Sequence, residues 1–237
     1  MIALFNTLIF EPLFNLLVFV VSLVPGNELG VAIIIVTLII RGMLYPLSHK
    51  ALKSQRQLTK LQPEIKKIQE KHKKDKQEQS KAIMEFYKEN NINPFSGCVP
   101  FLIQIPIIIG LYRVFLININ NDIGEHLYSF VSAPENINTV FLNIDLVGSS
   151  VFLAVLAGGA QFGLSKLTFS RKSKSGAPAA SGKAADFQNM MGKQMTYVLP
   201  VVTVFIAQNF PAGLVLYWFI TTLFSFGQQY VINKSVD

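Results

Sequence analysis

Residues 29–47 read LGVAIIIVTLIIRGMLYPL, an apolar run whose single charged side chain is Arg41. An α-helix needs about 20 such residues to cross the hydrocarbon core of a membrane. Similar runs lie in four later segments, 94–117, 146–167, 195–210 and 211–237. They are too long and too continuously apolar for barrel strands, and lipid admits only helices and closed barrels. The sequence therefore predicts an all-α polytopic membrane protein with five transmembrane helices and a short C-terminal tail.

The composition of the whole chain favours the same class. Of its 237 residues, 51% are hydrophobic and 15% are charged, and the mean hydropathy is +0.40. Soluble domains carry roughly 25% charged residues, so the composition argues against a cytosolic globular protein. The single cysteine, Cys98, excludes an internal disulfide and a cysteine-rich zinc site.

The N-terminal segment, residues 1–28, is also apolar but is interrupted at Glu11-Pro12. The run that remains, residues 13–24, is short for a transmembrane helix. The segment has no basic region at its start, which argues against a cleavable signal peptide. We expect an interfacial helix outside the cytoplasm, with a sixth span as the alternative.

Basic residues are distributed unevenly between the segments that flank the apolar runs. Residues 46–93 hold twelve lysines and arginines and residues 166–194 hold six, whereas residues 1–28 and 118–145 hold none. Segments rich in lysine and arginine stay in the cytoplasm. The sequence therefore predicts an N-terminus outside and a C-terminus in the cytoplasm.

The two basic segments differ in kind. In residues 48–93, Leu58, Leu61, Ile65 and Ile68 recur at helical spacing, and a second apolar stripe follows a charged turn. This pattern predicts a cytoplasmic antiparallel helical hairpin, in which Pro63 either kinks the first helix or belongs to a first turn. Residues 168–194 are rich in small residues and predict a flexible cytoplasmic loop, and residues 118–145 predict an extracytoplasmic loop.

The apolar runs lack the side chains that intramembrane catalysis needs. The three histidines lie outside the runs, and no acidic residue lies well inside one. The sequence contains no H-E-x-x-H motif, no phosphate-binding glycine loop and no G-x-S-x-G motif. We therefore expect no enzymatic activity, no cofactor and no metal site.

Arg41 is the residue that costs most to place in a membrane. One interpretation is an arginine that extends its guanidinium to the nearby helix end. The other is a permanent cation that faces a wet cavity, because no acidic residue in any span can neutralise it. For Arg113, which lies near the end of an outward-running span, we favour extension to the interface.

Two later runs carry polar stripes that favour a cavity. Gly158, Gln161 and Ser165 share one face of the third run, and a second stripe on the fifth run consists of Trp218, Thr222, Ser225 and Gln229. Packing between helices explains either stripe alone, and it is also the common role of a residue such as Gln104. Two stripes together with an unpaired arginine favour a hydrophilic groove.

Four motifs in this order resemble the YidC-type membrane-protein insertases (YidC/Oxa/Alb). The first is Leu38-Ile39-Ile40-Arg41 followed by Tyr45-Pro46-Leu47, and the second is the hairpin run from Leu58 to Lys67. The third is Asn93-Pro94-Phe95-Ser96-Gly97-Cys98-Val99-Pro100 through Gln104 to Tyr112, and the fourth is Phe210-Pro211-Ala212-Gly213 through Trp218. The resemblance covers nearly the whole chain. The chain lacks the large periplasmic domain of Gram-negative members and the lipobox cysteine of many Gram-positive ones, so either the N-terminus is trimmed or the lineage differs.

The resemblance implies a five-span core around a hydrophilic groove that is open to cytoplasm and lipid and closed toward the outside. Such a groove accepts nascent membrane proteins and releases their spans into the bilayer without nucleotide hydrolysis. The resemblance further implies a multi-pass protein of the bacterial plasma (inner) membrane. The expected role is that of an insertase and chaperone in membrane protein biogenesis, alone or with the Sec translocon. The residues expected at the groove are Arg41, Gln104, Gln161, Ser165, Tyr217, Trp218, Thr222 and Ser225.

The expected partners are nascent membrane proteins and membrane lipid, with the ribosome and the Sec translocon as further candidates. The basic hairpin also carries six acidic residues and lacks interleaved aromatic residues, which argues against specific nucleic-acid binding. Two other functions remain open at this point. One is a small channel or transporter with Arg41 as an anion site, although no repeats of the kind usual in transporters are visible. The other is a membrane-anchored docking hairpin for ribosomes.

Overall fold

The computed structural model describes residues 2–73, 75–90, 92–93, 99–117, 126–132, 134, 136–169 and 183–235. Its elements in chain order are α1 (Ile2–Phe5), η1 (Asn6–Phe10), α2 (Glu11–Leu23), η2 (Pro25–Asn27), α3 (Leu29–Met43), α4 (Tyr45–Lys60), α5 (Gln62–Lys71), α6 (Lys76–Glu89), α7 (Val99–Leu116), β1 (Val140–Phe141), β2 (Ile144–Asp145), α8 (Val151–Phe169), α9 (Lys183–Ala207) and α10 (Ala212–Ser235).

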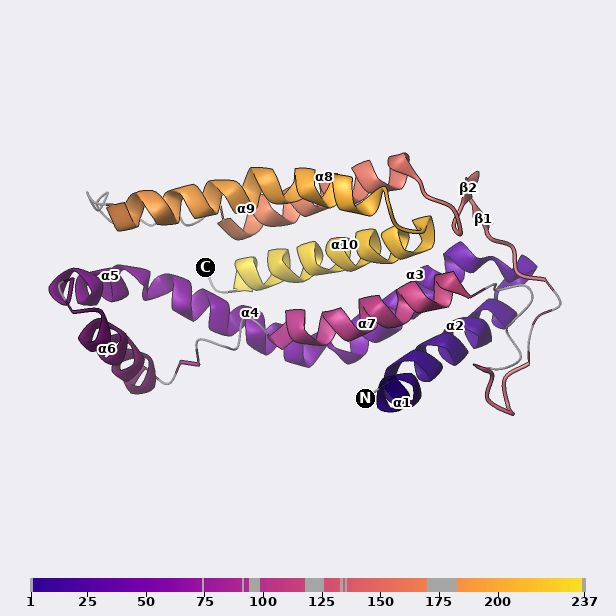
Figure 1. The fold of residues 1–237 in the computed structure, drawn as a ribbon, viewed down its shortest axis with the longest axis horizontal. Coiled ribbons are helices and arrows are strands. Elements are labelled where there is room, and N and C mark those ends of the chain that lie inside the picture. The colour runs from indigo at the N-terminus through magenta and orange to yellow at the C-terminus, as the bar shows by residue number, and fades with distance from the viewer. Residues whose placement is uncertain are drawn as a thin grey trace.

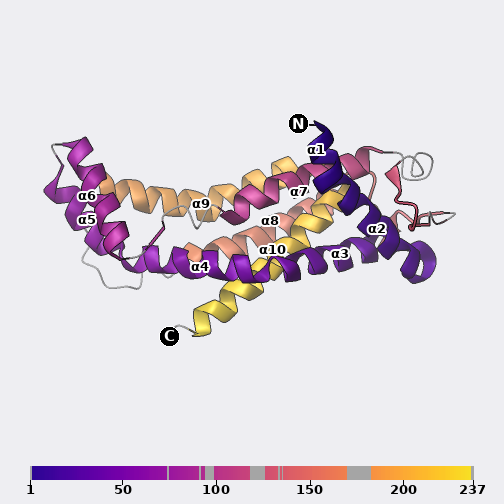
Figure 2. The same ribbon diagram turned by 90° about the horizontal axis from the view of Figure 1, so that it is seen from below.

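Helix α10 occupies the middle of the molecule (Figure 1). Helices α8 and α9 lie on one side of it and helices α3, α4 and α7 lie on the other. The pair α5 and α6 lies at one end of the long axis, and the antiparallel strands β1 and β2 lie at the opposite end. Figure 2 shows from below that α5 and α6 lie at the end of the molecule opposite the strands. The central place of α10 lets its side chains reach both helix layers.

A helix lies at each of the five predicted spans, but several bounds differ. Helix α8 begins at Val151 rather than at residue 146, because residues 146–150 form a loop after β2, at the end of which Ser150 Oγ accepts a hydrogen bond from the Leu153 N–H at 3.4 Å. Helix α9 begins at Lys183, so the C-terminal part of the predicted flexible loop is helical. Residues 94–98, 118–125 and 170–182, with Cys98 among them, lie outside the described part of the chain.

Length and apolar composition identify fewer crossing helices than the sequence predicts. In the described residues, Ala3–Leu23 and Val151–Thr168 are long and apolar enough to cross a membrane. The pair Leu29–Met43 and Tyr45–Leu58, bent by 62°, adds a third if it forms one span, and Leu102–Leu116 and Thr196–Ala207 are shorter apolar helices. The count of five spans stays a prediction.

The first predicted span ends earlier than its apolar run does. Helix α3 stops at Met43 and α4 starts at Tyr45. Pro46 falls in the first turn of α4, where the missing backbone N–H costs no helical hydrogen bond. The bend therefore separates an apolar helix from the polar helix that follows.

The N-terminal segment does not break at Glu11-Pro12, so that expectation was wrong. The π-helical turn η1 runs directly into α2, and Pro12 lies in the first turn of α2. A first-turn proline is compatible with a helix, so the chain is helical from Ile2 to Leu23. The interfacial position of this segment stays a prediction.

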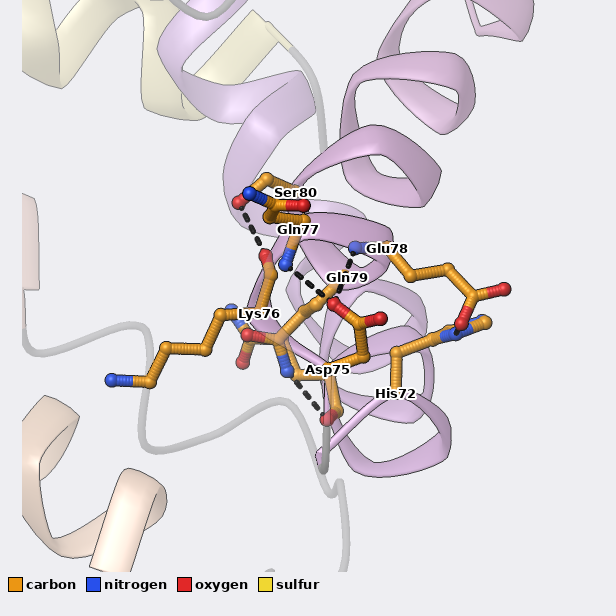
Figure 3. Close-up of polar contacts among 8 residues, drawn as sticks. His72, Asp75, Lys76, Gln77, Glu78, Gln79 and Ser80 are labelled. Atoms are coloured by element: carbon orange, nitrogen blue, oxygen red, sulfur yellow. Dashed lines mark hydrogen bonds and ion pairs between the residues drawn. The ribbon is translucent and has the colours of Figure 1, made fainter.

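Helices α5 and α6 follow the charged turn that the sequence indicates. Pro63 lies in the first turn of α5, which decides between the two interpretations of this residue. The Asp75 side chain caps α6 by accepting hydrogen bonds from the backbone N–H groups of Gln77 (2.9 Å) and Glu78 (3.1 Å), as Figure 3 shows. Only Ile65 of this pair is a buried apolar residue. The pair therefore has little apolar packing of its own.

Buried apolar side chains concentrate toward the end that carries β1 and β2. One continuous cluster draws on α2, α3, the last turns of α7 and the first turns of α10. Among described residues, the buried apolar side chains outside this cluster are Ala51, Ile65 and Ile232. The backbone of residues 146–148 seals the cluster by accepting hydrogen bonds from the N–H groups of Ala212 and Gly213. The opposite end is packed far more sparsely.

Candidate functional site

Arg41 lies at the border between these two regions. Ile40, the residue before it, is the last buried residue of α3. The Arg41 side chain is half-buried, and its Nη2 donates a hydrogen bond to Gln104 Oε1 of α7 at 3.0 Å. Helix α3 places Arg41 where the dense apolar packing ends, so the guanidinium is only partly buried.

Gln104 links Arg41 to a third helix. Its Nε2 donates to the hydroxyl oxygen of Tyr217, on α10, at 2.7 Å. A guanidinium can only donate, so the Gln104 carbonyl must face Arg41 and the amide nitrogen must face Tyr217. Tyr217 is 2% exposed, which makes it a buried anchor rather than a surface that a substrate could contact in this conformation. The three side chains join α3, α7 and α10.

Arg41 has no acidic partner in the described part of the chain. Helices α3, α7, α8 and α10 contain no aspartate or glutamate. Its Nε is buried and has no hydrogen-bond partner among the described residues. A buried cation normally has a partner, because an unpaired one costs several kcal/mol (about 3–5). The site therefore holds a cation with unused hydrogen-bonding capacity.

The polar stripe on α8 divides into two parts. A Cβ at Gly158 would lie 2.4 Å from Val204 Cγ2 and 3.0 Å from the Pro200 carbonyl oxygen, so Gly158 serves the close packing of α8 on α9. Ser165 is 3% exposed, and Gln161 is half-buried and donates to Ser165 at 3.5 Å. Only Gln161 of this stripe keeps appreciable exposure.

The stripe on α10 also contains both buried and half-buried residues. Thr222 is 2% exposed and donates to the Trp218 carbonyl at 2.9 Å. Trp218 and Ser225 are half-buried, and Ser225 donates to the Thr221 carbonyl at 2.9 Å. Hydrogen bonds of this kind satisfy hydroxyl groups inside a helix. Helical spacing places these residues on a face but does not separate packed from open positions.

Arg113 has partners that the sequence analysis missed. Its Nη1 donates to Asn6 Oδ1 at 2.6 Å, so free extension to the interface does not describe it. A second missed contact joins Arg56 of α4 to the end of α10, where Nη1 donates to the Ile232 carbonyl at 2.6 Å. Both arginines reach helices distant in sequence, and no local pattern indicates such partners.

Comparison with known proteins places the chain in a family. The model of the family described as "60Kd inner membrane protein" matches residues 20–237. The chain is 35% identical over 214 residues to "Membrane protein insertase YidC" of Pelobacter propionicus, covering 90% of this chain and 36% of that protein. It is 39% identical over 205 residues to the protein of the same name from Francisella tularensis subsp. novicida, covering 86% and 32% respectively.

A solved structure agrees with these matches. The crystal structure described as "Active YidC insertase crystal structure with the first transmembrane domain resolved" superposes with a TM-score of 0.55 at 28% identity, covering 85% of this chain and 41% of that one. The chain spans about a third of the length of the curated relatives that it matches. The chain therefore belongs to the 60Kd inner membrane protein family, that of the YidC-type insertases.

Proposed function

We propose that this chain is a membrane-protein insertase. It accepts nascent membrane-protein segments in a positively charged hydrophilic groove that is open to cytoplasm and lipid, and it releases their spans into the bilayer without nucleotide hydrolysis. It acts alone or with the Sec translocon. The names of the relatives support this proposal, as does the arrangement around Arg41.

The observation that carries the proposal is the unneutralised cation at the edge of the apolar cluster. Arg41 is half-buried, donates to a neutral amide and has a buried Nε without a partner among the described residues. A carboxylate of an incoming segment could accept hydrogen bonds from the N–H groups of Arg41, because no acidic side chain in the described part of the chain neutralises this cation. Charge-assisted hydrogen bonds of this kind are roughly twice as strong as neutral ones.

The groove lowers a barrier and does not supply the driving force. A polar segment held near Arg41 has a shorter apolar region left to cross. Burial of the substrate's own apolar span then contributes roughly 25 cal/mol per Å², which amounts to tens of kcal/mol for a whole helix in gross terms. The groove must bind weakly, because a tightly held segment would not leave.

The topology of the proposed insertase follows from charge. We place α5 and α6 in the cytoplasm as a helical hairpin, with the basic segments 48–93 and 168–194 on that side. The end that carries β1 and β2 then faces outward, and its dense apolar packing is suited to closing the groove on that side. Nascent chains, lipid, the ribosome and the Sec translocon are the proposed partners.

Substitutions of Arg41 test the role of its charge. If the arginine attracts acidic segments, Arg41→Lys retains much of the insertion activity, whereas Arg41→Ala and Arg41→Glu fail for substrates with acidic tails. If a bidentate fork is needed, lysine fails as well. Insertion is measured in sealed vesicles by protease protection of a small single-span substrate.

A matched substrate with a neutral tail is the control for this series. Its insertion should depend little on Arg41, because no carboxylate meets the cation. An alanine variant that inserts acidic-tailed substrates at the normal rate would remove the electrostatic role. Protein yield and stability in detergent are measured for each variant, so that loss of fold is distinguished from loss of insertion.

A further inference from the structure

Helix α7 carries two polar side chains on opposite faces. Gln104 and Arg113 are nine residues apart, which is 2.5 turns of an α-helix. Gln104 binds Arg41 and Tyr217, so its face is turned toward α3 and α10. Arg113 is turned toward the N-terminal helical segment, residues 2–23, and binds Asn6. The proposed function uses the first face and leaves the second unexplained.

The contacts of Arg113 form a specific docking site. Besides its 2.6 Å hydrogen bond to Asn6, its Cζ lies 5.0 Å from the ring centre of Phe10 and 5.9 Å from that of Phe5. Aromatic ring faces attract a cation, the more so where water is excluded, and Phe10 is 1% exposed. One hydrogen bond and two rings together satisfy a cation that would otherwise be costly in lipid.

Close helix packing one turn earlier completes the docking site. A Cβ at Gly110 would lie 3.0 Å from Leu13 Cδ1 and 3.3 Å from Ile9 Cγ2. Small residues allow helix backbones to approach one another in membranes. Figure 2 shows the N-terminal segment beside α7, and α7 packs more extensively against η1 and α2 than against α4 and α10.

The N-terminal segment has a second point of attachment, within α2. Asn15 is 3% exposed, donates to the His126 carbonyl at 2.9 Å and accepts from the Tyr128 N–H at 2.7 Å. Most of the outward-facing side chains are apolar, with Leu4 and Leu8 each 65% exposed. Interfacial helices are typically rich in lysine and arginine, but this segment contains neither. A helix embedded beside α7 fits these observations better than one lying on the surface.

We propose that residues 2–23 form a brace for α7, docked at Gly110 and Arg113, and that the docked brace holds Gln104 within reach of Arg41. Packing on one face of α7 presses its other face toward α3 and α10. Arg113 is therefore a positioning residue. The second half of this proposal rests on the proposed function, whereas the first half does not.

Disulfide cross-linking tests the docking directly. Ile9→Cys and Gly110→Cys are combined in a Cys98→Ser background and oxidised in membranes. Ile9 Cγ2 lies 3.3 Å from the Gly110 Cβ position, so the two Cβ atoms are within reach of a disulfide. Most chains should cross-link. The pair Leu8→Cys and Gly110→Cys is the control and should cross-link several-fold less, because Leu8 points outward. Equal yields from the two pairs would overturn the docking.

The role of Arg113 is tested in the same cross-linkable chain. Adding Arg113→Leu should lower the cross-linking yield several-fold, and Arg113→Lys should restore part of it, since an ammonium still binds the rings but lacks the planar fork. An unchanged yield with leucine would overturn the assignment of Arg113. These yields are measured without substrate, so they stand apart from the outcome of the Arg41 series.

Insertion assays test the bracing. Arg113→Leu should insert substrates several-fold more slowly. Oxidation of the Ile9→Cys and Gly110→Cys pair in that variant, continued until most chains are cross-linked, should restore the rate, because the covalent bond replaces the docking contacts. In the chain with native Arg113, the oxidised pair should insert as fast as the reduced pair. Failure of the cross-link to restore the rate, or loss of insertion on oxidation of the chain with Arg113, would overturn the brace.

Discussion

Replacing Gln104 by glutamate should make the protein more stable and the groove less active. A carboxylate in place of the amide would lie about 3–4 Å from the Arg41 guanidinium, where the present contact is 3.0 Å. At an effective dielectric constant of about 20, two unit charges about 4 Å apart attract by roughly 4 kcal/mol. Desolvation of the carboxylate offsets part of this gain, so a net stabilisation of about 1–3 kcal/mol is expected.

The hydrogen bond to Tyr217 survives this substitution. At present the tyrosine hydroxyl accepts from Gln104 Nε2, and a hydroxyl can donate to a carboxylate instead. The link between α7 and α10 therefore remains, and the change is confined to the charge of the site. An acidic substrate tail held about 8 Å from Arg41 would lose about 2 kcal/mol of attraction at the same dielectric constant. Insertion of that substrate should fall roughly thirtyfold, at about 1.4 kcal/mol per factor of ten.

Gln104→Leu is the matched control, because it removes both hydrogen bonds and keeps the charge of Arg41. Loss of a hydrogen bond to a charged group costs about 1.5–3 kcal/mol, so this variant should be the least stable of the three. The expected order of stability is glutamate, glutamine, leucine, whereas insertion of acidic-tailed substrates should be lowest with glutamate. Unfolding in detergent and protease protection in vesicles measure the two orders. A glutamate variant that inserts acidic tails at the wild-type rate would refute the reasoning.

Three further measurements follow from the packing. Hydrogen exchange should be fast in α5 and α6 and slow in the bundle helices, since Ile65 alone of that pair is a buried apolar residue; uniform protection would contradict this. Gly158→Leu should destabilise the fold by about 1–3 kcal/mol, because its Cβ alone would lie 2.4 Å from Val204 Cγ2. A Cβ at Gly159 would meet nothing within 4 Å, so Gly159→Leu should be tolerated, as measured by unfolding in detergent. In a Cys98→Ser background, Ser225→Cys should react with a charged thiol reagent, added from the cytoplasmic side, several-fold faster than Thr222→Cys does. The reason is that Ser225 is half-buried whereas Thr222 is 2% exposed. Equal rates would show that this face of α10 opens to water.

The positions of the bundle helices could be predicted from the sequence because each depends on a local property. A continuous apolar run is sufficient to place α3, α7, α8 and α10, and the two apolar stripes on either side of a charged turn indicate α5 and α6. The motif around Arg41 also identified the residue on which the site centres. Local reasoning failed at Glu11-Pro12, where a polar interruption suggested a break. A first-turn proline and a π-helical turn instead carry the helix through.

The links between helices could not be predicted in the same way. The contact of Gln104 with Tyr217 joins residues 113 positions apart, and that of Arg113 with Asn6 joins residues 107 apart. Helical periodicity says which residues share a face, but it does not say which neighbour covers that face. This is why Ser165 and Gln161 share a stripe and yet differ in exposure.

The dense packing beyond Arg41 has an electrical consequence. One face of helix α3 is buried in the apolar cluster from Leu29 to Ile40, and the twelve residue steps from Leu29 to Arg41 span about 18 Å. The hydrocarbon core of a bilayer is about 30 Å thick. If water reaches Arg41 from the cytoplasm, nearly the whole transmembrane voltage falls across this shorter layer, so the field there is roughly one and a half times that in plain lipid. An acidic tail resting at Arg41 would then gain almost the full 2.3 kcal/mol or so per charge at about 100 mV as it moves outward. The protein would in this way concentrate the transmembrane voltage on the last step of translocation.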